Sequence, residues 1–175
     1  GPLRAWRIAD NRHPIYDGTG AMAWGARWNS PAHPVIYASA SFACAMLERL
    51  AHAGIGSIPK NQHSITIEIP AIDIEEITVA DVSGWDRPDL SVSRAYGDGW
   101  LHSKRTAVLV VPSVVARPDS NVLINPWLHL QTDSQCFHAI EPGTELIAEA
   151  AIVDLFEKKG HQFCDVQVSA YRSHD

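Results

Sequence analysis

The chain has 175 residues, of which 46% are hydrophobic and 19% are charged, and its formal net charge is −6 at pH 7. This composition predicts one folded domain with a sizeable core, not a disordered chain. The acidic balance, without any run of lysine and arginine, excludes a nucleic-acid binder that neutralises phosphates. No apolar run approaches the roughly 20 residues of a membrane-spanning helix and no signal-peptide pattern opens the chain, so we expect a cytoplasmic protein without a membrane partner.

The residue types that commonly hold metals or form disulfides lack the required spacing. Cys44, Cys136 and Cys164 stand at unrelated spacings and predict reduced thiols. The nine histidines form no His-Glu-x-x-His arrangement, and the sequence has no Cys-x-x-Cys pair, so we expect no metal. A Gly-x-Ser-x-Gly elbow and a Walker-type phosphate loop are also missing, which disfavours those hydrolase and nucleotide-binding classes.

The first 24 residues predict one strand and a loop. Gly1-Pro2 is expected to be a protease-cleavage scar, and the apolar-basic stretch from residue 3 to 8 predicts a first strand. Residues 10 to 24 predict a loop because of Pro14, Gly18 and Gly20. The Gly18-Thr19-Gly20 run superficially fits a dinucleotide fingerprint, but no hydrophobic strand precedes it, so we reject a Rossmann domain.

The stretch from Gly25 to His52 predicts a basic turn, a short buried strand and an apolar helix. Arg27 lies in the turn, and residues 35 to 38 form the strand. The helix is expected to start after Ser41 as N-cap and to stop at Gly54. Glu48 lies in the middle of this almost wholly apolar helix, where an ionised carboxylate is unfavourable unless a cationic group meets it.

The neighbours of Glu48 on its helical face are Cys44, Ala45, Ala51 and His52, and three of these four are small. Small side chains around a carboxylate leave a hollow in which a ligand could lie. The alternative is that Glu48 and His52 form a surface pair on an exposed stripe. Sequence alone leaves both interpretations open.

The remainder of the chain predicts further strands and two helices. Residues 64 to 69 alternate in hydrophobicity as a strand does, and the β-branched run from 107 to 111 is typical of a central strand buried on both faces. Residues 76 to 79 predict a short edge strand. Residues 89 to 105 have helical spacing weakened by Gly97 and Gly99. Residues 144 to 159 predict an amphipathic C-terminal helix stopped by Gly160.

Five short motifs stand in order along the chain: Gly25-Ala26-Arg27-Trp28-Asn29, Val35-Ile36-Tyr37-Ala38, Ala45-Met46-Leu47-Glu48, Val111-Pro112-Ser113 and Asn121-Val122-Leu123-Ile124-Asn125-Pro126. In order and spacing they resemble the RES domain family, over about residues 5 to 130. The chain departs from the family pattern in two places. Trp127-Leu128-His129-Leu130 follows Asn125-Pro126 where the family usually has His-Pro, and the predicted helical tail after Gly143 is longer than the compact ending expected for the family.

The resemblance implies a bacterial toxin that consumes NAD, from a pair whose antitoxin carries an Xre-like helix-turn-helix domain. A homodimer within the toxin–antitoxin complex is compatible with it. The implied fold is α+β, a single domain with a mixed, mostly antiparallel central sheet flanked by helices, similar to ADP-ribosyltransferase toxins. We expect a core over residues 3–135 and a C-terminal helical extension of the same domain over 136–175.

The resemblance also implies displacement at the ribose carbon that bears nicotinamide, with NAD as substrate. Glu48 would stabilise the cationic sugar, Arg27 would hold the pyrophosphate, and Tyr37 would stack on nicotinamide or orient its amide. The implied catalytic residues are Glu48, Arg27 and Tyr37, and the implied NAD-binding residues are Arg27, Trp28, Asn29, Tyr37, Ser113 and Asn121.

The acceptor stays open at this point. Water would give an NAD glycohydrolase, phosphate an NAD phosphorylase, and a protein side chain an ADP-ribosyltransferase that modifies a host metabolic protein. NAD degradation is favoured because no acceptor-recruiting loop is recognisable. A second alternative is a catalytically inactive binding partner in which Arg27 and Glu48 form a structural ion pair.

Overall fold

The computed structural model describes residues 1–53, 60–71, 74–126, 141, 143–158 and 161–172. The chain divides into two compact units, Gly1–Leu130 and Gln131–Asp175. None of the helices described in these ranges is long and apolar enough to cross a membrane. The predicted helix stop at Gly54, the Trp127–Leu130 departure, Cys136 and Gly160 lie outside the described residues.

The first unit is built on a six-stranded sheet with the strand order β3-β1-β2-β6-β5-β4. Neighbouring strands are antiparallel, except that β4 runs parallel to β5. This confirms the expected mixed, mostly antiparallel sheet. The strands are β1 (Leu3–Asp10), β2 (Ile36–Ser39), β3 (Gln62–Ile69), β4 (Ile74–Glu76), β5 (Val108–Pro112) and β6 (Ser120–Ile124).

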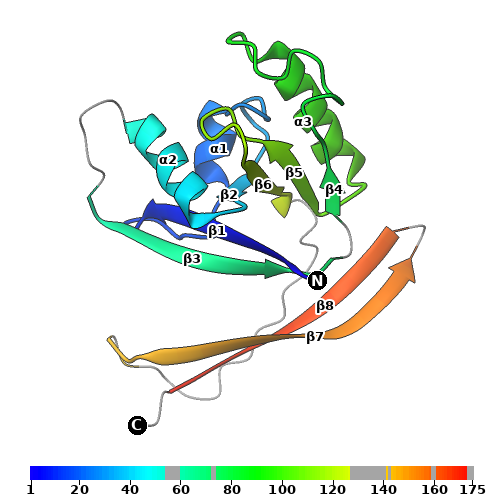
Figure 1. The fold of residues 1–175 in the computed structure, drawn as a ribbon. Helices are drawn as coiled ribbons and strands as arrows, with labels where there is room; N and C mark the ends of the chain where they lie inside the picture. The colour runs from blue at the N-terminus through cyan, green and yellow to red at the C-terminus, as the bar shows by residue number, and fades with distance from the viewer. Residues whose placement is uncertain (54–59, 72–73, 127–140, 142, 159–160, 173–175) are drawn as a thin grey trace. The chain divides into compact units, whose positions relative to one another are not determined.

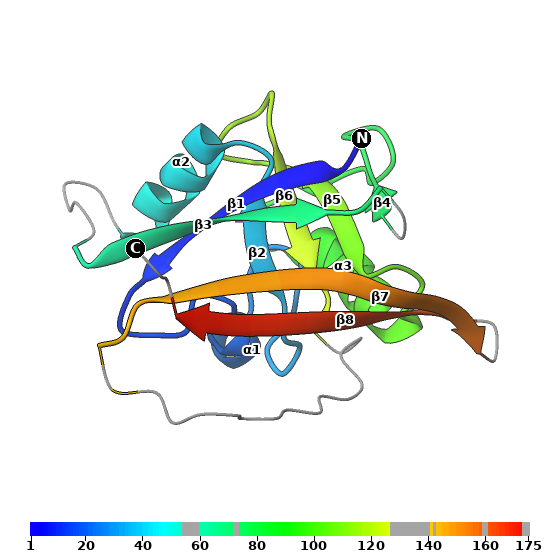
Figure 2. The ribbon, with the colours of Figure 1, turned by 90° about the horizontal axis from the view of Figure 1, so that it is seen from below.

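Three helices accompany this sheet: α1 (Thr19–Trp24), α2 (Phe42–Ala53) and α3 (Ser91–Ser103). Figure 1 and Figure 2 show α2 next to the β1–β3 end of the sheet and α3 next to the β5–β4 end. The predicted loop over residues 10 to 24 is wrong at its end, because α1 forms there. The carboxylate of Asp17 accepts the Thr19 N–H at 2.9 Å and so satisfies a free donor at the start of this short helix.

Strand β5 lies between β6 and the edge strand β4, and it confirms the predicted burial of its β-branched run, since all five of its residues are buried. Leu109 and Val111 belong to a core cluster that includes Trp100 of α3. Val108 and Val110 belong to a second cluster, with Val122 of β6 and residues of β1 and β2. Both faces of the strand are therefore packed, as expected for a strand in the middle of a sheet.

Gly97 allows α3 to approach the turn that carries Arg27. A Cβ atom added at Gly97 would lie 1.8 Å from the carbonyl oxygen of Trp28, whereas one added at Gly99 would meet nothing within 4 Å. The low helix propensity of glycine is thus offset at Gly97 by a close backbone contact. This contact fixes α3 against the residue 25–30 turn.

The second unit contains a hairpin of β7 (Leu146–Lys158) and β8 (His161–Arg172). The predicted C-terminal helix is therefore wrong. The strands pair from Leu146↔Arg172 to Lys158↔His161, with an irregularity between Ile152 and Asp154. Three alternate residues of β7 before that point are apolar and face apolar partners on β8 (Ala148↔Ala170, Ala150↔Val168 and Ile152↔Val166), so cross-strand pairing overrides the helix propensity of Ala, Leu and Glu.

Candidate active site

A single cavity of about 940 Å3 in the first unit contains most of the predicted site residues. It is lined by parts of β1, β2 and α2, by segments around α1, and by the first turn of α3. Its lining includes Arg27, Trp28, Tyr37, Glu48 and Asn121, but neither Asn29 nor Ser113. The structure thus brings together five of the seven residues.

The Glu48 side chain is half-buried and held by two neutral donors. Its Oε1 accepts hydrogen bonds from Ser113 Oγ at 2.8 Å and from Asn121 Nδ2 at 2.6 Å. Oε2 accepts no hydrogen bond from the described residues. The alternative that Glu48 pairs with His52 on an exposed stripe is therefore wrong. One carboxylate oxygen is anchored, and the other is free to meet a ligand in the cavity.

Asn121 reaches Glu48 because β6 lies between β2 and β5. Its backbone is in register with Ser39 on one side and Val111 on the other. Ser39 is buried, and its Oγ donates to Asn121 Oδ1 at 2.8 Å. This contact orients the amide so that its Nδ2 faces Glu48.

Ser113 supports Glu48 from outside the cavity. Its side chain is fully buried, and its Oγ accepts the N–H groups of Val115 at 3.2 Å and Ala116 at 2.9 Å. With two donors already aimed at the hydroxyl oxygen, its single proton goes to Glu48. Ser113 therefore contacts Glu48 and does not line the cavity.

The start of α2 is tied to the same region. Ser41 Oγ accepts the N–H of Cys44 at 3.1 Å, which confirms Ser41 as the helix N-cap. The Ser41 hydroxyl also donates to the Asp119 carboxylate, and the Asp119 carbonyl accepts the Ser113 N–H at 3.0 Å. The helix that carries Glu48 and the loop that carries Ser113 are therefore linked through Asp119.

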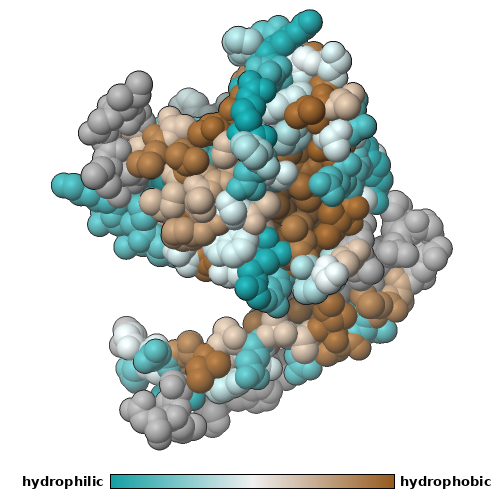
Figure 3. Space-filling view, viewed as in Figure 1, coloured by the Kyte–Doolittle hydropathy of each residue, from teal (hydrophilic) through white to brown (hydrophobic). Residues whose placement is uncertain are grey.

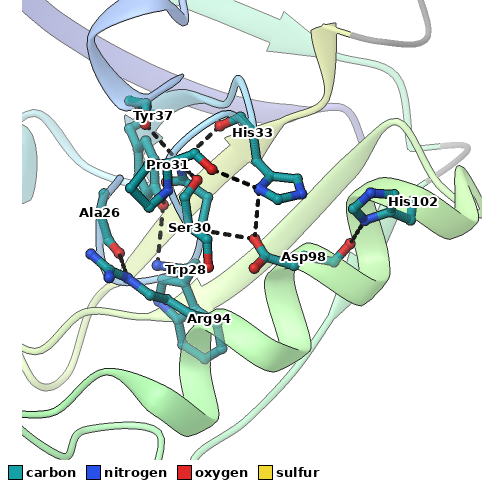
Figure 4. Close-up of polar contacts among 11 residues, drawn as sticks. Ala26, Trp28, Ser30, Pro31, His33, Tyr37, Arg94, Asp98 and His102 are labelled. Carbon is teal, nitrogen blue, oxygen red and sulfur yellow. Dashed lines mark hydrogen bonds and ion pairs between the residues drawn. The ribbon is translucent and has the colours of Figure 1, made fainter. Parts of the chain in front are cut away.

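Arg27 lies on another wall of the cavity and is held by backbone carbonyls. Its Nη1 donates to the carbonyls of Trp85 at 3.2 Å and Arg87 at 3.3 Å. Arg94 on α3 lies close by, where its Nε donates to the Ala26 carbonyl at 2.9 Å (Figure 4). The ion pairs of the described residues include none between Arg27 and Glu48, so the structural ion pair of the inactive alternative does not form.

Tyr37 lines the cavity and also belongs to a buried polar network around Asn29. The Tyr37 hydroxyl accepts the Trp28 N–H at 3.2 Å and donates to Asn29 Oδ1 at 2.8 Å. Burial raises the pKa of Tyr37, so the phenol stays neutral. Asn29 is fully buried, and its Nδ2 donates to the carbonyls of Ala21, Ser30 and His33.

The contacts of Asn29 and Trp28 are mainly structural. Every polar atom of the Asn29 amide is used within the protein, which leaves none for a ligand. The Trp28 ring is 1% exposed and stacks on Trp85 with a centroid separation of 6.0 Å. These two residues shape the wall behind Arg27 and Tyr37.

Three cationic residues of the cavity lining are not among the site residues predicted from sequence: Arg7, Arg49 and Arg94. Arg7 donates to the carbonyls of Ile15, of Asp17 at 2.9 Å and of Tyr37 at 2.6 Å, and burial lowers its pKa. The sequence does carry a signal for Arg7, because a charged residue stands between Trp6 and Ile8 inside the predicted first strand. The ion pairs of the described residues include none with Arg7, Arg27, Arg49 or Arg94.

The cavity lining has four arginines against the three carboxylates of Asp10, Asp17 and Glu48. Asp10 is already bridged by Arg12 at 2.6 Å. An excess of positive charge in a half-enclosed cavity of an acidic protein favours an anionic ligand. Within the described ranges, no group of three or more His, Cys, Asp or Glu side chains is arranged to hold a metal ion.

The fold and the cavity define a mixed α/β domain in which an anchored carboxylate and several arginines line one cavity. A chain in the crystal structure of the M. tuberculosis MbcT–MbcA toxin–antitoxin complex has a similar fold, with a TM-score of 0.53 and 20% identity over 71% of this chain and 74% of that chain. The model of the RES domain matches residues 4–142. The chain belongs to the RES domain family.

Curated relatives agree with this membership. The chain is 38% identical over 130 residues, 69% of its length, to the "Prs ADP-ribosylating toxin" of a Sphingobium species, of which the match covers 81%. It is 30% identical over 144 residues, 80% of its length, to the "Toxin Res" of Yersinia enterocolitica, of which the match covers 93%. The matched family region ends before the β7–β8 hairpin begins.

Proposed function

We propose that the protein is the toxin of a RES-type toxin–antitoxin pair and that it cleaves the nicotinamide–ribose bond of NAD. The observation that carries this proposal is the Glu48 carboxylate, anchored through one oxygen by Ser113 and Asn121 and lining a cavity that also contains arginines. The names of the relatives support the toxin assignment.

Arg27 and Arg94 are the proposed holders of the NAD pyrophosphate. One nitrogen of Arg27 donates to two backbone carbonyls, and one nitrogen of Arg94 donates to a single backbone carbonyl. These hydrogen bonds fix each guanidinium and leave its other N–H groups for a ligand. A guanidinium presents paired donors that match phosphate oxygens, and each such charge-assisted bond is stronger than a neutral one. Two guanidinium groups on one wall suit the two negative charges of a pyrophosphate.

Glu48 is the proposed catalytic carboxylate. The reacting carbon is C1″, the ribose carbon that bears nicotinamide. When the bond between C1″ and the nicotinamide nitrogen breaks, nicotinamide leaves with the bonding electron pair as a neutral base, and positive charge builds on the ribose. A carboxylate already fixed beside that carbon stabilises the charge without reorganising during the reaction. Its two hydrogen-bond donors are neutral, so the full negative charge of Glu48 remains available to the sugar.

Nicotinamide release from NAD tests the proposal. Purified protein is incubated with NAD alone, and free nicotinamide is followed by chromatography. Glu48→Gln keeps the shape of the side chain but removes its charge, so we expect a loss of about 10²–10³-fold, the size found when one transition-state-stabilising group is removed. Glu68→Gln on β3 is the matched control, because Glu68 pairs with Arg4 on the exposed surface. Equal rates for Glu48→Gln and wild type would rule out this role.

Transfer of ADP-ribose to a protein is the second candidate, and the name of the Sphingobium relative favours it. In that case the attacking group is a protein side chain instead of a small acceptor. Nicotinamide release would then require an added acceptor protein, and adenine-labelled NAD would leave its label on that protein. Release from NAD alone, with free ADP-ribose as product, would assign the chain to NAD degradation.

The proposed partner is an antitoxin with an Xre-like helix-turn-helix domain. Exposed apolar side chains follow one face of α2, and Figure 3 shows apolar surface over this helix; they are Phe42, Met46, Leu47 and Leu50. The opposite face of α2 lines the cavity through Ala45, Glu48 and His52, so a protein that covers the apolar face lies at the cavity rim. Met46→Asp should abolish co-purification with the antitoxin, and the exposed charge change Arg4→Ala should not.

A further inference from the structure

One large aromatic side chain of the cavity lies in solvent. Trp24 lines the cavity and is 83% exposed, the highest value among the large apolar residues that the structure describes. A tryptophan ring is usually well buried, because it gains much free energy when it leaves water. Single exposed apolar side chains are nevertheless common on protein surfaces, so the surroundings of Trp24 decide what its exposure means.

The backbone that carries Trp24 is fixed, although its side chain is not covered. Trp24 is the last residue of α1, and the Gly25 N–H donates to the Ala21 carbonyl at 2.8 Å where the helix ends. The Met22 carbonyl accepts the Ala32 N–H at 2.7 Å, which ties the helix to the segment that follows the turn. The ring is therefore presented to solvent from a backbone that is held in place.

Packing into the core does not explain a tryptophan at this position. Helix α1 contributes no buried residue. Four of its six residues line the cavity instead: Thr19, Gly20, Ala21 and Trp24. The position of the ring therefore favours a role in the cavity over a role in the core.

Trp24 also stands next to the two guanidinium groups that are proposed to hold the pyrophosphate. The chain turns sharply after it at Gly25, whose φ is 68°, and Arg27 follows two residues later. Arg94 reaches the same turn, because its Nε donates to the Ala26 carbonyl at 2.9 Å (Figure 4) and its Nη2 would lie 3.1 Å from a Cβ atom added at Gly25. An anion held by Arg27 and Arg94 thus lies near the end of α1 that carries Trp24.

The two halves of NAD extend in different directions from the pyrophosphate. The nicotinamide ribose belongs beside Glu48 on α2 in the proposed reaction, which leaves the α1 side of the arginines for the adenosine half. Adenine is flat, aromatic and uncharged, so it needs no ionic partner and gains most from a face on which it stacks. An exposed indole beside a diphosphate site has the chemistry that a purine base requires.

We propose that Trp24 is the platform on which the adenine base of the substrate stacks. The inference rests on the proposed NAD cleavage for the identity of the substrate. The binding itself requires only a nucleoside diphosphate, with its diphosphate on Arg27 and Arg94 and its base on the indole. Trp24 is thus a substrate-binding residue that does not touch the bond that breaks.

Binding of ADP tests the stack without catalysis, because ADP contains the base and the diphosphate but no nicotinamide. ADP and inorganic pyrophosphate are titrated into the protein by calorimetry at constant ionic strength. We expect Trp24→Ala to weaken ADP binding about tenfold, as for the loss of one base–aromatic stack, and to leave pyrophosphate binding unchanged. Trp24→Phe keeps an aromatic face and should bind ADP within about threefold of wild type. The matched control Tyr171→Ala removes an exposed ring from the hairpin and should bind like wild type.

The fluorescence of Trp24 gives a second measurement that reports the contact directly. Acrylamide quenches an exposed indole, and a base stacked on the ring shields it. ADP should therefore reduce acrylamide quenching in wild type, whereas inorganic pyrophosphate should not. Trp24→Phe should lose this effect while it still binds ADP.

Three results would overturn the proposal. The first is equal ADP affinity in wild type and Trp24→Ala, including the case in which that variant no longer co-purifies with the antitoxin, because Trp24 would then contact a protein. The second is an equal loss of ADP and pyrophosphate affinity, because Trp24 would then shape the turn without contacting the base. The third is weaker binding of nicotinamide mononucleotide with unchanged binding of ADP, because the ring would then face nicotinamide.

Kinetics separate this inference from the proposed function. With NAD as substrate, Trp24→Ala should raise KM about tenfold and leave kcat unchanged, since the stack contributes equally to the ground state and the transition state. An unchanged KM would contradict the stack. If ADP shields Trp24 but wild type releases no nicotinamide, with or without an acceptor protein, the stack stands and the proposed cleavage fails.

Discussion

Asn29 and Asn121 use the same side-chain amide in two buried networks of opposite character. The amide of Asn29 bonds only to protein groups, including the hydroxyl of Tyr37 and the carbonyls of Ala21 and His33. The amide of Asn121 accepts a hydrogen bond from Ser39 and donates one to the Glu48 carboxylate. The other oxygen of that carboxylate has no hydrogen-bond partner among the described residues. In the Asn29 network every polar atom of the amide bonds to protein, so the network stabilises the fold. The Asn121 network ends at a carboxylate oxygen that is available to a ligand in the cavity.

The Asn29 network depends on the close approach of α3 to the residue 25–30 turn. Gly97→Ala should disrupt this approach and have the largest effect on stability of the variants considered. Its Cβ would lie 1.8 Å from the Trp28 carbonyl, so the helix or the turn must move. We expect a loss of more than about 3 kcal/mol in the free energy of unfolding, measured by urea denaturation. Gly99→Ala in the same helix meets nothing within 4 Å and should be stabilising by about 0.5–1 kcal/mol. Similar stabilities for the two variants would contradict the close contact.

Asn29→Ala and Asn121→Ala compare the two networks directly. Asn29→Ala leaves several buried carbonyls and the Tyr37 hydroxyl without their partner, so we expect about 3 kcal/mol of destabilisation. Asn121→Ala should cost only about 1 kcal/mol of stability but lower nicotinamide release about tenfold or more, because Glu48 loses a donor. Urea denaturation and turnover are measured on both. A larger stability loss for Asn121→Ala would refute the division between a scaffold and a site.

Ser113→Ala is expected to have a smaller and mixed effect. The substitution removes one donor to Glu48 and the acceptor of the Val115 and Ala116 N–H groups. We expect a loss of about 1 kcal/mol in stability and about tenfold in nicotinamide release, with an unchanged KM for NAD because Ser113 does not line the cavity. A raised KM with unchanged kcat would place Ser113 in contact with the substrate.

Glu75 offers the smallest effect, as a carboxylate that is paired with a cation where Glu48 is not. Arg105 holds the pKa of Glu75 below its ordinary value. A carboxyl group with a lowered pKa in the folded state contributes stability above its unfolded pKa, and that stability is lost as the pH falls toward the folded value. Between neutral and acidic pH, wild type should therefore lose more stability than Glu75→Gln, measured by urea denaturation at each pH. Parallel pH profiles would show that the ion pair contributes nothing.

The sequence identified features whose signal is local. The alternation in β3, the β-branched run of β5 and the N-cap Ser41 each predicted an element that the structure confirms. The placement of Glu48 in an apolar helix also predicted a special environment, because a charge in such a run conflicts with its surroundings. In each case the residues that determine the feature lie within a few positions of it in the sequence.

Features that depend on distant partners were missed. The hairpin strand β7 has helix-forming residues, and only its pairing with β8 makes it a strand. Arg49 and Arg94 are ordinary helix residues by sequence, and only the fold places both on one cavity. The sequence also cannot show that two backbone N–H groups donate to the Ser113 oxygen, because this contact depends on how the following loop folds.

The order in which the chain leaves the ribosome matters for such a site. Glu48 emerges early, but its two holders follow 65 and 73 residues later. Until β6 has been translated, the nascent polypeptide has the carboxylate without the groups that aim it. Fragments from stalled translation that end before Ser113 therefore lack both groups that hold Glu48, and they lack the assembled site.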